Sequence, residues 1–176
     1  MMTMLDMILH RRSVRQYTDA PIPREKLDAI LHAGLAAASS KNRKPWELIV
    51  VQSRTTLDQL CDCRPGAANL LGKCKAAIVV AADTELVDVW VEDCASAMTQ
   101  MHLMADALGV GSCWLQVRLR KAPDGVTDTQ DIVRSILGIP EKYCVMAILT
   151  LGMPASHPGA KDISTLPLEK IHYEHF

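Results

Sequence analysis

The segment from Val87 to Leu108 is the most regular in the chain and predicts one long amphipathic helix. Its apolar residues recur every three or four positions, at Val91, Cys94, Met98, Met101, Ala105 and Leu108. Gly109 follows at once, where a helix commonly stops. At about 1.5 Å per residue, this helix spans roughly 30 Å, the diameter of a small domain. We therefore expect it to be central to the fold or to lie at an interface.

Shorter patterns on either side of this segment predict further helices and four strands. A helix is expected from Pro23 to about Ser39, with proline at its first position, and another over Asp131–Leu137 with Gly138 as its stop. A short helical pattern begins at Met4. Strands are predicted, from β-branched content and length, at Trp46–Val51, Ala76–Ala82, Ser112–Val117 and Val145–Leu151. The second of these strands is apolar throughout, so we expect both its faces to be buried.

Composition places the chain among ordinary globular domains. Its 176 residues are 49% hydrophobic and 22% charged, and a chain of this length folds without disulfides or a structural metal. Past Gly152 the composition changes to Pro, His and Lys. We therefore expect a domain over residues 1–152 and a C-terminal extension over 153–176 that lies across something else, such as a partner subunit. With only three Trp, three Tyr and one Phe, the chain is not expected to hold a ligand mainly by stacked rings.

Charge and hydropathy exclude two classes of partner. Nineteen Lys and Arg stand against twenty Asp and Glu, without a long run of one sign, which argues against a nucleic-acid or anionic-membrane surface. The longest apolar run, Ala76–Ala82, falls far short of the roughly 18 residues of a membrane span. Asp6 interrupts the N-terminal apolar stretch, and Arg11 and Arg12 follow it, unlike a signal peptide. We expect a cytoplasmic protein whose six cysteines are reduced thiols.

The first segment that suggests chemistry is Arg11-Arg12-Ser13-Val14-Arg15, after the short N-terminal helical pattern. It presents three guanidinium groups and a hydroxyl within two turns. Guanidinium groups bind phosphate oxygens through two hydrogen bonds at once and stay charged at any working pH. A solvated basic surface explains the same residues about equally well. Taken alone, the segment does not decide between the two.

The second is the polar loop from Ser39 to Trp46, between the predicted helix and the first strand. Its short side chains, among them Ser39, Ser40 and Asn42, could form hydrogen bonds with a polyol or with the edge of a heterocycle. Serines that merely end the helix, with Pro45 as a breaker, are the simpler alternative.

The third is Gly109-Val110-Gly111-Ser112-Cys113-Trp114, which contains a G-x-G pattern. A dinucleotide-binding fingerprint needs a strand before its glycines and a helix after them, whereas here the helix comes first. These glycines instead suit a helix stop and a close backbone approach to a ligand or a packed neighbour.

Metal and nucleophile sites are not expected. Cys61, Cys63 and Cys74 lack the C-x-x-C pairs of zinc modules, and His102 lies inside the long predicted helix. Cys113 begins an apolar strand without a local histidine that would lower the pKa of its thiol.

Other titratable groups have simple explanations. Asp93 could be a buried acceptor, but an exposed helix face is the simpler account. The histidines of the C-terminal extension could titrate or bind something, but solvated side chains are the commoner case; they are His157, His172 and His175.

Taken in order and at these intervals, the motifs resemble the nitroreductase family of flavin mononucleotide (FMN) oxidoreductases. The matching pieces are Arg11–Tyr17, Ser39–Trp46, Glu92–Ala97 and Ala107–Trp114. The resemblance implies an α+β fold with a central, mainly antiparallel sheet flanked by helices. It also implies an intertwined homodimer with two flavin sites at the subunit interface.

The resemblance also assigns site residues. It implies that Arg11, Ser13 and Arg15 hold the phosphate, the ribityl chain and the pyrimidine edge of the flavin, with Arg12 contributing. The groups reaching the flavin from the other subunit would be Ser39, Ser40 and Asn42. The strand beside the flavin ring would contribute backbone groups of Trp114, Leu115 and Gln116. Lys161 is the nearest candidate for the family's C-terminal phosphate-binding residue.

The function implied by the resemblance is an FMN-dependent enzyme that takes electrons from NADH or NADPH. It would pass them by ping-pong hydride transfer to a small acceptor, such as a nitroaromatic or a quinone. Arg15 would stabilise the negative charge of the reduced flavin, and no side-chain nucleophile or metal would be needed. Alternatives are an FMN-binding module without NAD(P)H turnover, such as a flavin store or sensor, and specialised chemistry such as flavin fragmentation or reductive dehalogenation.

Two departures from the family pattern affect the expected site. The chain has Ala38 where the family often has Pro and Lys44 where it often has Gln, so the loop is expected to be looser and more positive. The chain also lacks the long inserted lid of larger members. We therefore expect an open site with weak substrate selectivity.

Overall fold

Four strands form one antiparallel sheet in the order β1-β2-β4-β3 in the computed structural model, which describes residues 3–176. The strands are β1 (Trp46–Val51), β2 (Ala76–Asp83), β3 (Gly111–Gln116) and β4 (Tyr143–Gly152). The helices are α1 (Met4–His10), α2 (Arg24–Leu35), α3 (Arg54–Cys61), α4 (Trp90–Ala107) and α5 (Thr129–Leu137). Short 3-10 helices are η1 (Ser40–Asn42), η2 (Ala67–Leu70), η3 (Ile163–Thr165) and η4 (Leu168–Lys170). The expected α+β fold with an antiparallel sheet is confirmed.

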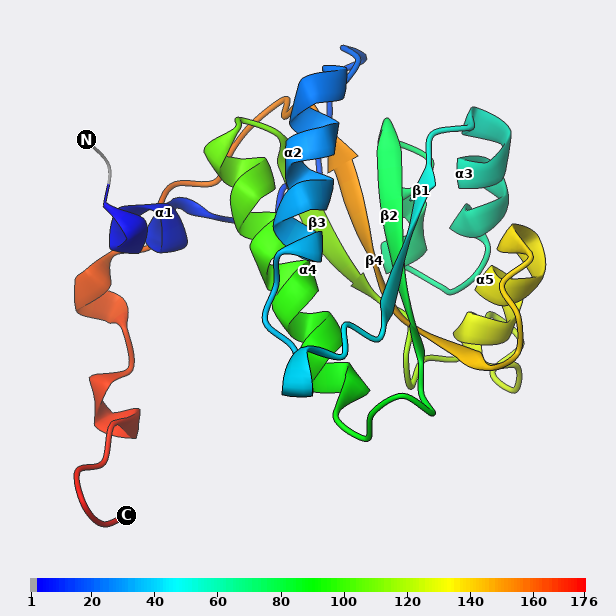
Figure 1. The fold of residues 1–176 in the computed structure, drawn as a ribbon. Helices are drawn as coiled ribbons and strands as arrows, with labels where there is room; N and C mark the ends of the chain where they lie inside the picture. The colour runs from blue at the N-terminus through cyan, green and yellow to red at the C-terminus, as the bar shows by residue number, and fades with distance from the viewer. Residues whose placement is uncertain (1–2) are drawn as a thin grey trace.

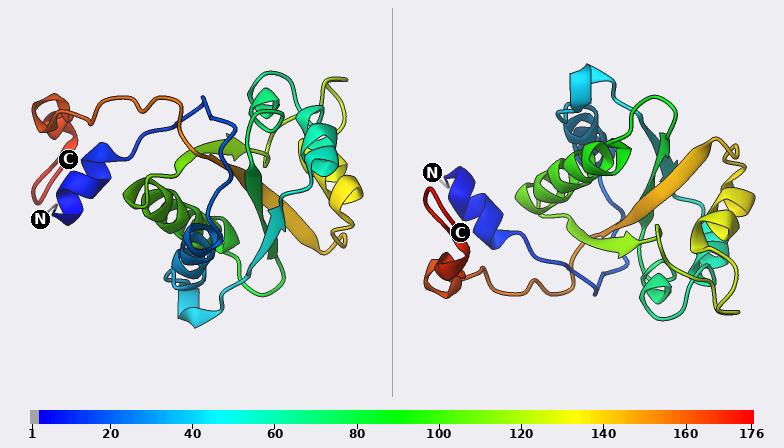
Figure 2. Two further views of the ribbon diagram at one scale, coloured as in Figure 1. Left: turned by 90° about the horizontal axis from the view of Figure 1, so that it is seen from above. Right: turned by 90° about the horizontal axis from the view of Figure 1, so that it is seen from below.

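Helices cover both faces of this sheet. Helices α2 and α4 lie on one face, and α3 and α5 on the other (Figures 1 and 2). Side chains alternate along β2, so that Ile78 and Val80 pack under α2 and α4 while Ala77 and Val79 pack under α3 and α5. Every residue of β2 is buried, which confirms the prediction from its unbroken apolar sequence.

Helix α4 is central, as its periodicity predicts. Its buried face includes Cys94, Met98, Met101 and Ala105, packed against α2 and the sheet. The helix begins at Trp90, three residues after the predicted start. It ends one residue before Leu108, and Gly109 follows with φ +69°, a left-handed conformation that glycine adopts without strain.

Several element boundaries differ from the prediction. Helix α2 ends at Leu35 instead of about Ser39, because Ser39 is already extended and begins a separate loop. Pro23 occupies the N-cap instead of the first helical position. Helix α3 was not predicted, since its eight residues contain too little apolar periodicity; Ser53 caps it by accepting a hydrogen bond from the Thr56 N–H.

The N-terminal and C-terminal segments run side by side. Residues 9–18 pair antiparallel with residues 153–161: the Thr18 N–H donates to the Met153 carbonyl (2.8 Å) and the Ala155 N–H to the Gln16 carbonyl (2.9 Å). Beyond this pairing, residues 162–176 form an exposed arm on the side of α1, away from the sheet and the helices that cover it (Figures 1 and 2). Within residues 3–176, none of the helices combines the length and hydropathy needed to cross a bilayer.

Candidate functional site

The arginine-rich segment Arg11–Arg15 is fixed against the edge of the sheet. The Val14 N–H donates to the Ser112 carbonyl of β3 (2.9 Å), and the Val14 side chain is buried. This close approach needs a glycine at position 111, because a Cβ there would lie 2.7 Å from Val14 Cγ1. Val14 is thus the anchor of the segment, and the polar side chains on either side of it stay at the surface.

A buried histidine positions the first arginine. Arg11 Nη1 lies 2.8 Å from His102 Nε2, and His102 Nδ1 lies 2.5 Å from Ser112 Oγ. Burial, with the charge of Arg11 as a second cause, lowers the pKa of His102 to about 4. The imidazole is therefore neutral near pH 7, with Nε2 accepting from the guanidinium and Nδ1–H donating to the serine. The sequence analysis did not assign this role, although His102 is four residues from Met98 and three from Ala105, on the buried stripe of α4.

The other two arginines of the segment also lack acidic partners. Arg12 donates to the Gly159 carbonyl of the C-terminal segment, and Arg15 makes only a long contact with the Ser13 carbonyl (3.4 Å). Within residues 3–176, no carboxylate forms an ion pair with Arg11, Arg12 or Arg15. Three guanidinium groups without carboxylate partners form a strong anion-binding set.

An open pocket of about 610 Å³ begins beside Arg15. Its lining residues are Arg15, Gln16, Tyr17, Asp19, Arg54, Gly72, Lys73 and Lys75. Four of these carry positive charge, and only Asp19, which pairs with Lys75 (2.9 Å), carries negative charge. The pocket therefore favours anionic or strongly polar ligands.

The pairing of the two terminal segments brings Lys161 near the arginines. The Lys161 N–H donates to the Leu9 carbonyl (2.9 Å), two residues before Arg11, and its side chain is exposed. A fourth cation of the predicted set therefore lies in the same region as Arg11 and Arg12.

Strand β3 contributes residues of two kinds. Leu115 is buried in the core beneath α3 and α5, so only its backbone is available to a ligand. Trp114 and Gln116 are half-buried, and the Trp114 Nε1–H donates to Gln116 Oε1 (2.9 Å). Because β3 is an edge strand, its outer backbone groups remain accessible along part of its length.

The loop with Ser39, Ser40 and Asn42 lies at the N-terminal end of α4, whereas Arg11 contacts His102 in the C-terminal half of that helix. The Ser40 N–H donates to Asp93 Oδ1 (2.8 Å), and the Lys44 N–H donates to Ser39 Oγ (3.0 Å). Positive φ angles at Lys41, Asn42 and Lys44 make this loop sharply turned. The loop therefore has a defined conformation, fixed by these hydrogen bonds, and is not merely the end of α2.

Asp93 is buried, so the expectation of an exposed helix face is wrong. The residue is 5% exposed, and its Oδ2 atom has no hydrogen-bond partner among the described residues. Asp93 precedes Ala97, Met101 and Ala105 by four, eight and twelve positions, which places it on the buried stripe of α4. This spacing could have revealed its burial from the sequence.

One chain does not bring the two predicted groups of cofactor residues together. Asp93 contacts the Ser40 loop and His102 contacts Arg11, and nine positions of one straight helix separate these two anchors by about 14 Å. The two groups of predicted residues therefore lie apart, one toward each end of α4.

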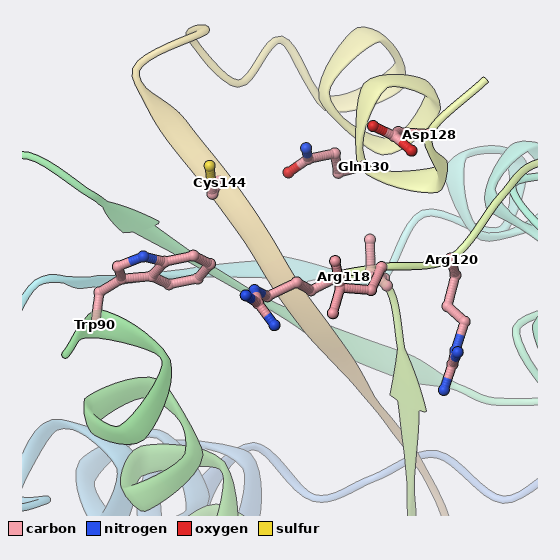
Figure 3. A pocket seen from close by; sticks show the side chains of 8 residues that line it. Trp90, Arg118, Arg120, Asp128, Gln130 and Cys144 are labelled. Carbon is pink, nitrogen blue, oxygen red and sulfur yellow. The ribbon is translucent and has the colours of Figure 1, made fainter. Parts of the chain in front are cut away.

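A smaller pocket of about 140 Å³ lies beyond the end of β3 and near the start of α4. Figure 3 shows Arg118 pointing toward the ring of Trp90, with Cys144 of β4 on one side and Asp128 and Gln130 at the start of α5. The Arg118 guanidinium carbon is 5.6 Å from the Trp90 ring centroid. None of these residues was predicted to belong to a site from the sequence.

Cys113 and His157 have different surroundings. Burial raises the pKa of the Cys113 thiol, which opposes a role as a nucleophile, as expected. His157 is not a loose, solvated group: its Nε2 lies 2.8 Å from Asp106 Oδ1, and its ring stacks on that of His10.

The donor set fits flavin mononucleotide. That cofactor carries a phosphate, a polyol chain and a polar ring edge. The guanidinium groups of the Arg11–Arg15 segment, which have no carboxylate partners within residues 3–176, suit the phosphate and the ring edge, and the Ser13 hydroxyl suits the polyol.

Comparisons with known proteins agree with this geometry. The sequence matches the profile of the Nitroreductase family over residues 8–82 and 62–153. A structure described as an FMN-dependent nitroreductase from Clostridium difficile R20291 superposes with a TM-score of 0.95 at 40% identity, covering 98% of this chain and 100% of that one. A relative from Methanothermobacter thermautotrophicus, with the provisional name NADH dehydrogenase/NAD(P)H nitroreductase, is 32% identical over 98% of this chain and 87% of its own length. A provisionally assigned nitroreductase from Desulfovibrio desulfuricans, solved in complex with FMN, has a TM-score of 0.74 at 25% identity, covering 96% of this chain and 97% of that one.

Proposed function

Because the chain belongs to the nitroreductase family, we propose that it is an FMN-dependent oxidoreductase that uses NADH or NADPH to reduce nitroaromatic or quinone-type acceptors. The names of its relatives support FMN-dependent oxidation of a reduced nicotinamide. The acceptor class, the subunit arrangement and the roles of individual residues are parts of the proposal. A cytoplasmic location stays a prediction from the sequence.

The observation that carries the proposal is the Arg11–Arg15 segment, held rigidly by Val14 and His102 and without carboxylate partners in the described chain. In this proposal Arg11, Arg12 and Lys161 bind the phosphate, and Ser13 binds the ribityl chain. Because His102 already holds the Arg11 guanidinium, little side-chain entropy is lost when the anion binds.

Arg15 is proposed to lie at the pyrimidine edge of the ring. When bound, the flavin supplies the redox chemistry, accepting a hydride from a reduced nicotinamide and passing electrons to the acceptor. The guanidinium of Arg15 remains positive at any working pH, so it stabilises negative charge that develops beside it. Backbone groups of Trp114, Leu115 and Gln116 are proposed to lie along the ring, in a site left open for acceptors of different shapes.

We propose that two copies of the chain complete each site, with Ser39, Ser40 and Asn42 supplied by the partner. Exposed apolar side chains support this arrangement: Met4 (67% exposed) lines an apolar depression on α1, α2 and α4, and Leu35 (52%) is the last residue of α2. The C-terminal arm also exposes apolar side chains that a partner subunit could bury. They are Ile163, Leu168, Ile171, Tyr173 and Phe176. Residues 153–176 are therefore proposed to pack partly on the partner subunit.

The first experiment tests turnover. Purified protein is loaded with FMN and mixed anaerobically with NADH or NADPH, and then with a nitroaromatic or a quinone. The proposal expects loss of flavin absorbance with a nicotinamide and its return with an acceptor. Failure to bind FMN would refute the site, whereas FMN that binds but is reduced by neither nicotinamide would favour a flavin store or sensor.

The second experiment tests the shared site by mixing two variants, Arg11→Ala and Asn42→Ala, at an FMN concentration too low for either variant alone to be active. If each site takes Arg11 from one chain and Asn42 from the other, a mixed dimer contains one intact site and regains activity. If both residues serve the same site within one chain, every site in the mixed dimer stays defective and no activity returns.

A further inference from the structure

Three potential metal ligands meet where three separate segments of the chain come together. His10 is the last residue of α1, Asp106 lies in the last turn of α4, and His157 belongs to the segment that follows β4. One ligand atom from each residue lies within 4.8 Å of the other two. No metal site was expected from the spacing of the cysteines or from His102, and the three residues of this cluster are 96 and 51 positions apart along the chain, so no local spacing reveals them.

Asp106 is the centre of this cluster. Its side chain is only 6% exposed, yet both oxygens have partners: Oδ2 lies 2.6 Å from His10 Nδ1, and Oδ1 lies 2.8 Å from His157 Nε2. Arg11 and Arg12 are close in sequence to His10, but they bind His102 and the Gly159 carbonyl instead. Within residues 3–176, the carboxylate therefore has ion-pair contacts with the two imidazoles alone.

The tautomer of His157 points to a cation between its ring and the carboxylate. His157 Nδ1 lies 2.7 Å from the Pro158 carbonyl oxygen, which can only accept, so Nδ1 must carry a hydrogen. In the neutral ring Nε2 is then unprotonated, and its lone pair faces an anionic oxygen at 2.8 Å. Two ligands of one tetrahedral zinc lie about 3.3 Å apart, so a metal ion could bridge these two atoms after they move apart by about half an ångström.

The stacking of the two histidine rings brings a nitrogen of each to the same carboxylate. The ring centroids of His10 and His157 are 4.5 Å apart and the ring planes 15° apart. A divalent ion can use one ring nitrogen of each histidine together with a carboxylate oxygen. The hydrogen bond from Nδ1 to the Pro158 carbonyl is the support that a metal-bound histidine usually has on its other ring nitrogen.

We propose that His10 Nδ1, Asp106 and His157 Nε2 form a binding site for a divalent transition-metal ion of the Zn²⁺ type. Two imidazoles and one carboxylate are a ligand set suited to zinc, and the partly exposed histidine rings leave a fourth position for water. The metal joins α1, α4 and the C-terminal segment at one point, directly before Arg11. This site is independent of the proposed function, since none of its three ligands belongs to the proposed flavin site.

The test is a titration of the FMN-loaded protein with zinc chloride in competition with a chelator at neutral pH. Wild-type protein is expected to bind one Zn²⁺ per chain, and His10→Ala, His157→Ala and Asp106→Asn are each expected to weaken binding more than about tenfold. His172→Ala is the matched control, because His172 lies in the exposed arm, stacked on Phe176, and is expected to leave binding unchanged.

A second measurement needs no variant. Crystals soaked in zinc chloride are expected to show an anomalous-scattering peak between His10 and His157. Weak binding without a fixed stoichiometry, binding that survives in His10→Ala and His157→Ala, or a peak only at cysteines or at His172 would each overturn the proposal.

Discussion

The two ends of α4 hold their neighbours differently. At the N-terminal end, Asp93 holds the Ser40 loop by one backbone hydrogen bond and keeps a second, buried oxygen free within the described structure. At the C-terminal end, His102 uses both ring nitrogens, between Arg11 and Ser112, and Asp106 uses both carboxylate oxygens. Polar groups that have all their partners fix a single geometry, whereas a free acceptor leaves room for a new donor.

This difference indicates which half of the proposed site is preformed. The Arg11–Arg15 half is organised within one chain before any ligand arrives. The half with Ser39, Ser40 and Asn42 lies next to Asp93 Oδ2, a buried acceptor without a hydrogen-bond partner in the described structure. We therefore expect this loop to change conformation when the partner chain and the cofactor bind.

The largest expected effect concerns pH and the neutral state of His102. Because burial and Arg11 lower the pKa of His102 to about 4 from 6.5, the unfolded chain binds the proton more tightly. Its contribution to the free energy of unfolding is complete above pH 6.5 and is lost as the pH falls toward 4, in total about 3 kcal/mol at 1.36 kcal/mol per pKa unit. Urea unfolding of wild type and His102→Gln at several pH values measures this loss. Equal pH dependence of the two proteins would contradict the neutral-histidine assignment.

Removing Arg11 tests whether the preformed end binds the phosphate. Arg11→Ala is expected to raise the Kd for FMN about a hundredfold, because a charge-assisted hydrogen bond to an anion contributes roughly 1.5–3 kcal/mol. Fluorescence titration with FMN measures the change. Arg24→Ala is the control, since Arg24 pairs with Asp28 on the exposed face of α2; an equal effect in both variants would exclude a specific role for Arg11.

Removing the carboxylate at the other end tests the adjustable loop. Asp93→Ala leaves the Ser40 N–H without its partner and is expected to lower the free energy of unfolding by about 2 kcal/mol. The neighbouring Glu92 is exposed, so Glu92→Ala is expected to change it by less than about 0.5 kcal/mol. Thermal and urea unfolding of the two variants make the comparison, and indistinguishable stabilities would show that Asp93 does not hold the loop.

The smallest expected effect concerns Arg15, which is exposed and has only a long contact with the Ser13 carbonyl. Arg15→Ala is expected to weaken FMN binding about tenfold and to make the bound flavin harder to reduce, since a positive charge beside the ring is lost. A redox titration against a reference dye measures the potential. An unchanged potential would show that Arg15 does not lie at the ring edge. Arg15→Lys is expected to restore part of the lost potential, because lysine returns the positive charge.

Local sequence patterns predicted most of the fold. The apolar stripe of α4, the unbroken apolar sequence of β2 and the β-branched residues of β1 each specify an element from neighbouring residues alone. The eight-residue helix α3 was missed because so short a segment shows little periodicity, and its stability comes from Leu57 and Leu60 packed against the sheet.

The site was predicted less completely. Arg11–Arg15 stands out because of its charge, but the support from His102 depends on burial created by the tertiary fold. Asp106 was not singled out at all, since nothing in its local sequence shows that His10 and His157 will meet it. Contacts between residues so far apart depend on the pairing of the two terminal segments, which has no local signal in the sequence.

The pairing of residues 9–18 with residues 153–161 also determines when, during synthesis of the chain, the Arg11–Arg15 segment can reach its final contacts. The Arg11–Arg15 segment emerges from the ribosome before both of its neighbours, β3 and the segment after β4, which are synthesised much later. Contacts between distant parts of a chain form slowly because the long loop between them must first close. The proposed phosphate-binding surface is therefore completed only after all four strands have been made, so binding of the cofactor there cannot guide the early steps of synthesis.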